Sequence, residues 1–128
     1  MKRFITLTAV LFLAATVYAG DVRGIGIVEL NSLIQDKRVT LLDANGTESW
    51  QKRHIPGAID FETSKDKLSD LLPANKDALI VAYCGSPKCM AYKAAVAAAQ
   101  KLGYTNVKHL PAGIKGWVRA GEPTDSGK

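Results

Sequence analysis

The chain has 128 residues, of which 47% are hydrophobic and 23% are charged, and its formal net charge is +5. These values are typical of one globular domain, and they exclude a low-complexity, fibrous or repeat-built chain. The sequence contains two cysteines and two histidines. Two cysteines alone cannot complete a tetrahedral metal site, and the histidines are distant in sequence, so we expect no metal centre.

The first nineteen residues have the three-part pattern of a secretory signal peptide. A basic start (1–3) precedes an almost wholly apolar run (4–17), and Ala19 stands where an export peptidase would cut. The apolar run is short for a membrane span, and no second run follows it. We therefore expect a signal peptide at 1–19, cut after Ala19, and one domain at 20–128. The mature protein is expected to be periplasmic or secreted, with no stable membrane span after leader cleavage.

Cleavage at this site lowers the charge of the chain. The count of lysine and arginine falls from 17 to 15, because Lys2 and Arg3 leave with the leader, while all 12 acidic residues stay. The resulting charge of +3 is mild, and the basic residues are scattered rather than arranged along one helix. A nucleic-acid partner is therefore not expected, whereas a mild positive field favours small anions.

Strands and helices alternate along the predicted domain. Short apolar or β-branched runs predict strands, and apolar residues at helical spacing predict helices. The expected strands are 39–43, 58–61, 78–83 and 106–110. The expected helices are 29–35, 47–53, 66–72, 89–102 and 114–120. This alternation is typical of an α/β fold with a mostly parallel central sheet and helices on both faces.

A cysteine follows the most apolar strand, and a short loop then leads to the alanine-rich helix. Ligands of open α/β sheets bind beyond the carboxyl ends of the strands, where Cys84 is expected. Unpaired amides and the helix dipole at such a turn stabilise an anion, which lowers the pKa of a thiol. We therefore predict that Cys84 is an exposed, reactive nucleophile. The expected cradle for its substrate or persulfide consists of Gly85, Ser86, Pro87, Lys88, Cys89 and Met90.

Four blocks of the sequence, in order, resemble a single-domain rhodanese. They are "VTLLDAN" (39–45), "RHIPGAI" (53–59), "LIVAYCGSPKC" (79–89) and "LPAGIKGWVRAGEPT" (110–124). The resemblance covers nearly all of the predicted mature chain. It implies the rhodanese-like three-layer fold, in which a mostly parallel central sheet carries helices on both faces.

The resemblance also implies an activity, which is that of a sulfurtransferase. Cys84 would attack the outer sulfur of a small anionic donor such as thiosulfate and become a persulfide. A thiol, a partner protein or cyanide would then accept that sulfur, with ping-pong kinetics. No metal or organic cofactor is implied.

The loop differs from that of phosphatases and arsenate reductases built on similar folds. Those enzymes use Cys-x5-Arg, and the position of the arginine is taken here by Met90. Lys88 cannot replace the fork of a guanidinium, so phosphate-ester hydrolysis is disfavoured. The sequence also departs from the common rhodanese pattern, because Asp43 is followed by Ala44 and Asn45 where Asp-x-Arg is frequent.

Cys89 leaves two alternatives open. It is either a small apolar residue in the first turn of the helix or a resolving partner that attacks a Cys84 persulfide or forms a disulfide with Cys84. A disulfide requires Cα atoms within about 7 Å, which the sequence cannot establish. The alternative functions are thus a periplasmic thiol-disulfide redox module using Cys84 and Cys89, or a non-catalytic sulfur-carrier or docking domain. Asp43 and His54 are possible supports of the loop.

Overall fold

The structure is a computed structural model, and it describes residues 22–127. The predicted signal peptide at 1–19 and its cleavage site after Ala19 lie outside the described residues. Within 22–127, no helix is long and apolar enough to cross a bilayer.

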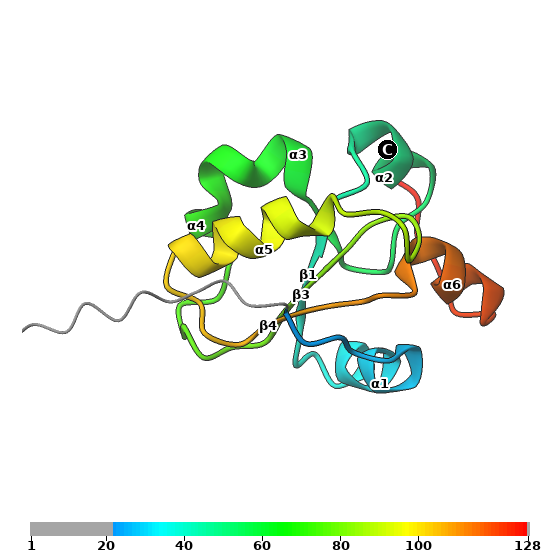
Figure 1. The fold of residues 1–128 in the computed structure, drawn as a ribbon, viewed down its shortest axis with the longest axis horizontal. Helices are drawn as coiled ribbons and strands as arrows, with labels where there is room; N and C mark the ends of the chain where they lie inside the picture. The colour runs from blue at the N-terminus through cyan, green and yellow to red at the C-terminus, as the bar shows by residue number, and fades with distance from the viewer. Residues whose placement is uncertain (1–21, 128) are drawn as a thin grey trace, which may run out of the picture.

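A four-stranded sheet forms the centre of the domain, in the order β2-β1-β3-β4 (Figure 1). The strands are β1 (Thr40–Asp43), β2 (Ile59–Asp60), β3 (Ile80–Tyr83) and β4 (Val107–His109). All the pairings between these strands are parallel, so the prediction of a mostly parallel α/β sheet is confirmed. Because Asp43 is in register with Tyr83, the carboxyl ends of the two central strands lie side by side.

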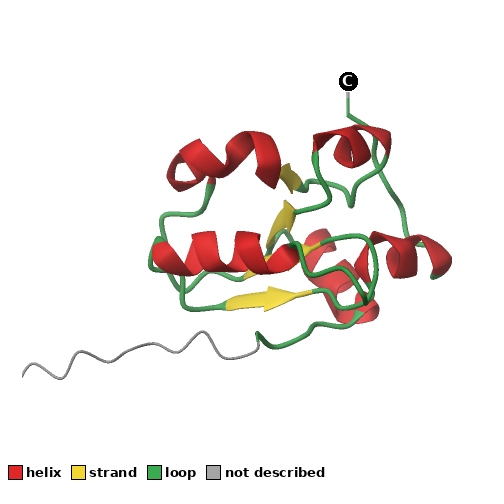
Figure 2. Cartoon of the chain, turned by 45° about the horizontal axis from the view of Figure 1, so that its top comes forward, coloured by secondary structure: helices red, strands yellow, loops and turns green. Residues whose placement is uncertain are grey.

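Helices cover both faces of the sheet, as Figures 1 and 2 show. The helices are α1 (Ile27–Gln35), α2 (Thr47–Lys52), α3 (Phe61–Ser64), α4 (Leu68–Leu71), α5 (Tyr92–Lys101) and α6 (Gly113–Arg119). A short 3-10 turn, η1 (Lys65–Lys67), joins α3 to α4. The α3, α4 and α5 helices lie on one face, whereas α1 and α6 lie on the other (Figure 1). The result is the three-layer arrangement that the alternating sequence pattern predicts.

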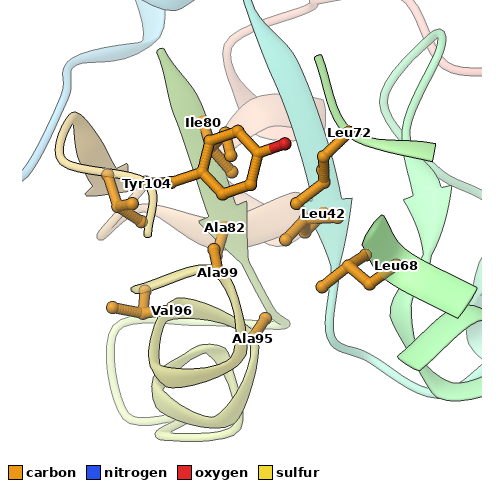
Figure 3. Close-up of a cluster of buried hydrophobic side chains, with 10 residues drawn as sticks. Leu42, Leu68, Leu72, Ile80, Ala82, Ala95, Val96, Ala99 and Tyr104 are labelled. Atoms are coloured by element: carbon orange, nitrogen blue, oxygen red, sulfur yellow. The ribbon is translucent and has the colours of Figure 1, made fainter. Parts of the chain in front are cut away.

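The central strand β3 is fully buried and contributes to two hydrophobic cores. Side chains alternate between the faces of a strand, so Ile80 and Ala82 pack under α5, while Val81 and Tyr83 pack toward α1 and α6. Figure 3 shows the first of these cores. Burial on both faces explains why this strand is apolar throughout, as in other parallel sheets.

Each of the nine predicted elements differs from the structure by at least one residue at an end, and three of these differences have a clear local form. The helix expected at 89–102 begins only at Tyr92, because a turn closed by the Cys89 amide and the Ser86 carbonyl (3.0 Å) precedes it. The strand expected at 58–61 ends at Asp60, whose side chain accepts a hydrogen bond from the Glu62 amide (3.2 Å) and caps α3. The helix expected at 66–72 is divided between η1 and α4.

Candidate functional site

Cys84 lies directly after β3, at the carboxyl edge of the sheet, and begins the segment that we call the cysteine loop (residues 84–91). The first turn of α6 holds the start of this loop. The Ile114 amide donates to the Cys84 carbonyl (2.9 Å), and the Lys115 amide donates to the Gly85 carbonyl (3.0 Å). Backbone hydrogen bonds from α6 therefore hold Cys84 and Gly85 in place.

Gly113 allows α6 to approach the cysteine loop this closely. Its φ is +64°, a conformation that side chains disfavour. A Cβ atom at this position would lie 2.7 Å from backbone atoms of Gly85 and from the Ser86 nitrogen. The glycine is therefore required both by the backbone conformation and by the contact with the loop.

Cys84 and Cys89 form a disulfide, and their Cα atoms are 6.2 Å apart. The turn at 86–89 brings the two cysteines together, which the sequence could not establish. Cys84 is 2% exposed, whereas Cys89 is half-buried. The expectation of an exposed thiol at Cys84 is thus wrong for this oxidised form, because Cys89 bonds to its sulfur and the surrounding structure covers it.

The amides of the cysteine loop are only partly available for the expected cradle. Pro87 has no N–H, and the Cys89 amide is used in the turn. Within residues 22–127, the amides of Gly85, Ser86, Lys88 and Met90 donate to no protein acceptor, the sulfur of Cys84 included. Four donors of the expected cradle (85–90) therefore remain for an anion, although they do not donate to the sulfur in the disulfide form.

A buried polar network lies beneath the start of the cysteine loop. The Tyr83 hydroxyl donates to Asp43 Oδ2 (2.8 Å) and accepts from the Ile55 amide (3.0 Å). Asp43 Oδ1 accepts from the Asn45 amide (2.8 Å), and the Asn45 side chain lies beside Gly85. Asp43, Tyr83 and Ile55 are inaccessible to solvent. Each buried polar group named here has a partner, as a stable interior requires.

Burial also determines the charge states in this network. Loss of solvent raises the pKa of Asp43, an effect that the hydrogen bonds from Asn45 and Tyr83 oppose. Burial, followed by the nearby Asp43 carboxylate, raises the pKa of the Tyr83 hydroxyl. Tyr83 therefore remains a protonated donor to Asp43 at physiological pH.

His54 contacts α2 and the C-terminal segment rather than the cysteine loop. Its Nδ1 lies 2.7 Å from the Trp50 carbonyl oxygen, and its ring stacks on the Trp50 ring with centroids 4.3 Å apart. Its backbone exchanges two 2.9 Å hydrogen bonds with Asp125, and the Gly127 amide donates to the Gln51 carbonyl (3.0 Å). We call residues 122–127 the C-terminal strap, because this segment runs from α6 back to α2.

An open cleft of about 540 Å³ lies between α2 and α6 and reaches Gly85. We call it the basic cleft, because four of its lining side chains are cationic, and among the described residues that line it none is acidic. These four are Lys52, Arg53, Lys115 and Arg119. The other lining residues are Asn45, Ser49, Gly85, Ile114 and Val118.

Sequence reasoning missed the basic cleft, because the cations looked scattered along the chain. Two local signals existed: Lys52 is adjacent to Arg53, and Lys115 is four residues before Arg119, which places both on one helical face. Nothing in the sequence shows that these two pairs face each other across one cleft. Lys88, the predicted cation of the cradle, is exposed and is not among the residues that line it.

Comparisons with known proteins agree with this architecture. Residues 27–120 match the rhodanese-like domain family. Over 91 residues the chain is 40% identical to an HTH-type transcriptional regulator of Mycobacterium tuberculosis, a match that covers 70% of this chain and 38% of the regulator. The chain thus spans less than half of that relative, whose regulatory role belongs to the longer protein.

Two solved structures have similar folds. Thiosulfate sulfurtransferase from Pseudomonas aeruginosa has a TM-score of 0.69 and 29% identity, over 86% of this chain and 20% of that protein. The BH2092 protein from Bacillus halodurans has a TM-score of 0.64 and 25% identity, over 81% of this chain and 77% of that protein. Because the family match covers most of the sequence and the fold agrees with it, this chain belongs to the rhodanese-like domain family.

Proposed function

We propose that the protein is a sulfurtransferase that uses Cys84 as its nucleophile. The Cys84 thiolate attacks the outer sulfur of a donor such as thiosulfate, the sulfur–sulfur bond of the donor breaks, and sulfite leaves. The persulfide then passes its outer sulfur to a thiol or to cyanide. The observation that carries this proposal is the position of Cys84, at the carboxyl end of the central strand and beside a cleft lined by four cations.

The charge of the basic cleft supports an anionic donor. Arg53 and Lys52, whose ammonium is paired with Glu48 (2.8 Å), come from one wall, and Lys115 and Arg119 come from the other. Cations on both sides of a cleft raise the local concentration of an anion and direct it toward the adjacent loop. The unpaired amides of the cysteine loop would then stabilise the negative charge of a persulfide on Cys84.

A second candidate function is a thiol-disulfide redox module, and the disulfide between Cys84 and Cys89 favours it. In this case the oxidised protein would pass its disulfide to a dithiol, and no sulfur donor would take part. Both functions use Cys84, but only the sulfurtransferase takes sulfur from a donor such as thiosulfate. Formation of sulfite from thiosulfate therefore distinguishes them.

We also propose that the protein acts outside the cytoplasm. The proposal rests on the export signal that the sequence predicts, and a disulfide between Cys84 and Cys89 is compatible with an oxidising compartment. Cell fractionation of the native host tests this directly. The mature form is expected in the periplasm or the medium, and a full-length form in the cytoplasm would contradict the proposal.

The test of the sulfurtransferase proposal is an assay with thiosulfate and cyanide after reduction of the disulfide. The reduced full chain is expected to form thiocyanate and sulfite. The Cys84→Ser variant should lose at least about a thousand-fold in rate, because its hydroxyl is a poor nucleophile without an activating base. Rates that are equal in both proteins would overturn the proposal. Transfer of a disulfide to a dithiol peptide without any sulfite formation would favour the redox module.

A further inference from the structure

We propose that Cys89 resolves the Cys84 persulfide internally, so that the protein also acts as a sulfane-sulfur reductase that releases sulfide. This inference rests on the proposed function, because it requires the persulfide on Cys84. The Cys89 thiolate attacks the Cys84 Sγ, the bond between Sγ and the outer sulfur breaks, and hydrosulfide leaves. Two thiols are oxidised to one disulfide while the sulfane sulfur is reduced to sulfide, so electrons and atoms balance.

The structure contains the product of this step. Cys84 and Cys89 are already joined, with Cα atoms 6.2 Å apart, and the turn between Ser86 and Cys89 keeps its backbone hydrogen bond. The bond that forms in the proposed attack is therefore compatible with an ordered loop. A nucleophile held at this position has a large proximity advantage over a thiol in solution.

Burial of Cys84 also favours attack by Cys89 over attack by an external thiol. Cys84 is 2% exposed, and its carbonyl and that of Gly85 accept hydrogen bonds from the first turn of α6. An external acceptor has little room to reach the inner sulfur from that side. Cys89 already reaches this sulfur from within the loop, and its neighbours Lys88 and Met90 are exposed.

The difference in exposure also predicts how the disulfide is reduced again. Cys89 is half-buried, whereas Cys84 is almost fully covered, so an incoming thiolate meets the Cys89 sulfur first. Its attack leaves Cys84 as the departing thiolate, which is the nucleophile needed for the next donor. The mixed disulfide on Cys89 must then be released, and a protein dithiol does this with its second thiol. The co-reactant is therefore a dithiol reductant of the thioredoxin type.

A single-turnover experiment separates this inference from the proposed function. The full chain is reduced, freed of reductant without oxygen, and mixed with thiosulfate in the absence of any acceptor. Sulfite reports the first step, sulfide reports the second, and the intact mass reports the state of the protein. The wild type is expected to release about one equivalent each of sulfite and sulfide and to lose two hydrogens.

Two variants of Cys89 provide the matched controls. Cys89→Ser and Cys89→Ala should still form sulfite, but each should keep a cyanide-labile gain of one sulfur and release less than about a tenth of the wild-type sulfide. Circular dichroism shows whether each variant is folded. Two different replacements are used so that a folding defect of one side chain is not mistaken for loss of the Cys89 thiol. Cys84→Ser should release neither product.

The outcomes are distinct for the two proposals. Sulfite without sulfide, with a stable persulfide on the wild type, overturns the resolving role and leaves the sulfurtransferase intact. Equal sulfide from the wild type and both Cys89 variants also overturns the resolving role. Absence of sulfite from the wild type overturns the proposed function itself.

Glutathione tests which of the two sulfurs a reductant attacks first. Its attack leaves a mixed disulfide, and a rapid acid quench preserves this adduct before the freed thiolate can expel the glutathione. Oxidised wild-type protein is mixed with glutathione, quenched with acid and mapped by peptide mass. The adduct is expected on Cys89. An adduct on Cys84 would overturn the proposed direction of reduction.

Discussion

Two neighbouring regions at the carboxyl edge of the sheet differ in how their polar groups are paired. In the buried network, Tyr83 joins Asp43 to the Ile55 amide, and each group has its partner. In the expected cradle of the cysteine loop (85–90), four amides have no protein acceptor within the described chain, and a disulfide connects the two sulfurs. The first region holds one geometry, whereas the second keeps donors free for a ligand. Under the proposed function, this difference assigns the network a structural role and the loop the chemical one.

The largest loss of stability is expected from a substitution that separates the cysteine loop from α6. Gly113→Ala places a Cβ 2.7 Å from the backbone of Gly85 in a left-handed conformation, so we expect a loss of about 3 kcal/mol in the free energy of unfolding. Urea denaturation measures this loss. Gly121→Ala is the matched control, because Gly121 has a φ of +79° and open space around its Cβ position. It should cost only about 1 kcal/mol, and equal losses would contradict the contact argument.

The next change removes the centre of the buried network. Tyr83→Phe leaves the Ile55 amide and Asp43 Oδ2 without their partner, which should cost about 2 kcal/mol of stability. Thermal or urea unfolding measures the cost. Tyr104→Phe is the control, because within residues 22–127 the Tyr104 hydroxyl donates to one acceptor, the Pro73 carbonyl, so that this substitution should cost about 1 kcal/mol. A smaller effect at Tyr83 than at Tyr104 would show that the network contributes little.

The pH dependence of stability tests the charge state of Asp43 in the buried network. Burial raises the pKa of Asp43 above its ordinary value of 3.8, so the folded state binds this proton more tightly than the unfolded state does. The associated stabilisation is fully present below that ordinary value and is lost as the pH rises through the folded pKa. Relative to Asp43→Asn, the wild type should therefore gain stability as the pH falls from neutral. A wild-type advantage that is constant or shrinks on acidification would contradict the direction of the shift.

The smallest expected effect concerns the basic cleft. Under the proposed function, Arg119→Gln should raise the KM for thiosulfate roughly threefold at low ionic strength, because one of the four cations is lost. Added salt should reduce the difference. Lys101→Gln on α5 is the control, because Lys101 is exposed and does not line the cleft. An equal change in both variants would mean that only net charge matters.

The sequence predicts the fold well because its signals are local. The apolar strand before Cys84, and helices between the strands, determine a parallel sheet with the cysteine at its carboxyl edge. The late start of α5 was missed, because the turn from Ser86 to Cys89 competes with the helix that the alanine-rich pattern favours. That turn also closes the disulfide, and spacing alone cannot give a distance between two Cα atoms.

The candidate site depends more on contacts between distant segments. The hydrogen bond from the Tyr83 hydroxyl to Asp43 depends on the register of β1 and β3, which the sequence does not specify. The basic cleft requires α2 and α6 to face each other, although Arg53 and Lys115 are far apart along the chain. The sequence therefore identifies the reactive and charged residue types, but it does not show which of them lie together in the folded protein.

The C-terminal strap has a consequence for how this protein could acquire a new donor preference. It ties α2 to the end of α6 through main-chain bonds between His54 and Asp125 and between Gly127 and Gln51. The separation of the two walls is thus a property of the backbone, and the cations project from it at the surface. Charge reversal at Lys115 or Arg119 would change which molecules enter without reshaping the opening. Under the proposed function, selection, natural or in the laboratory, can therefore vary donor recognition independently of the Cys84 sulfur.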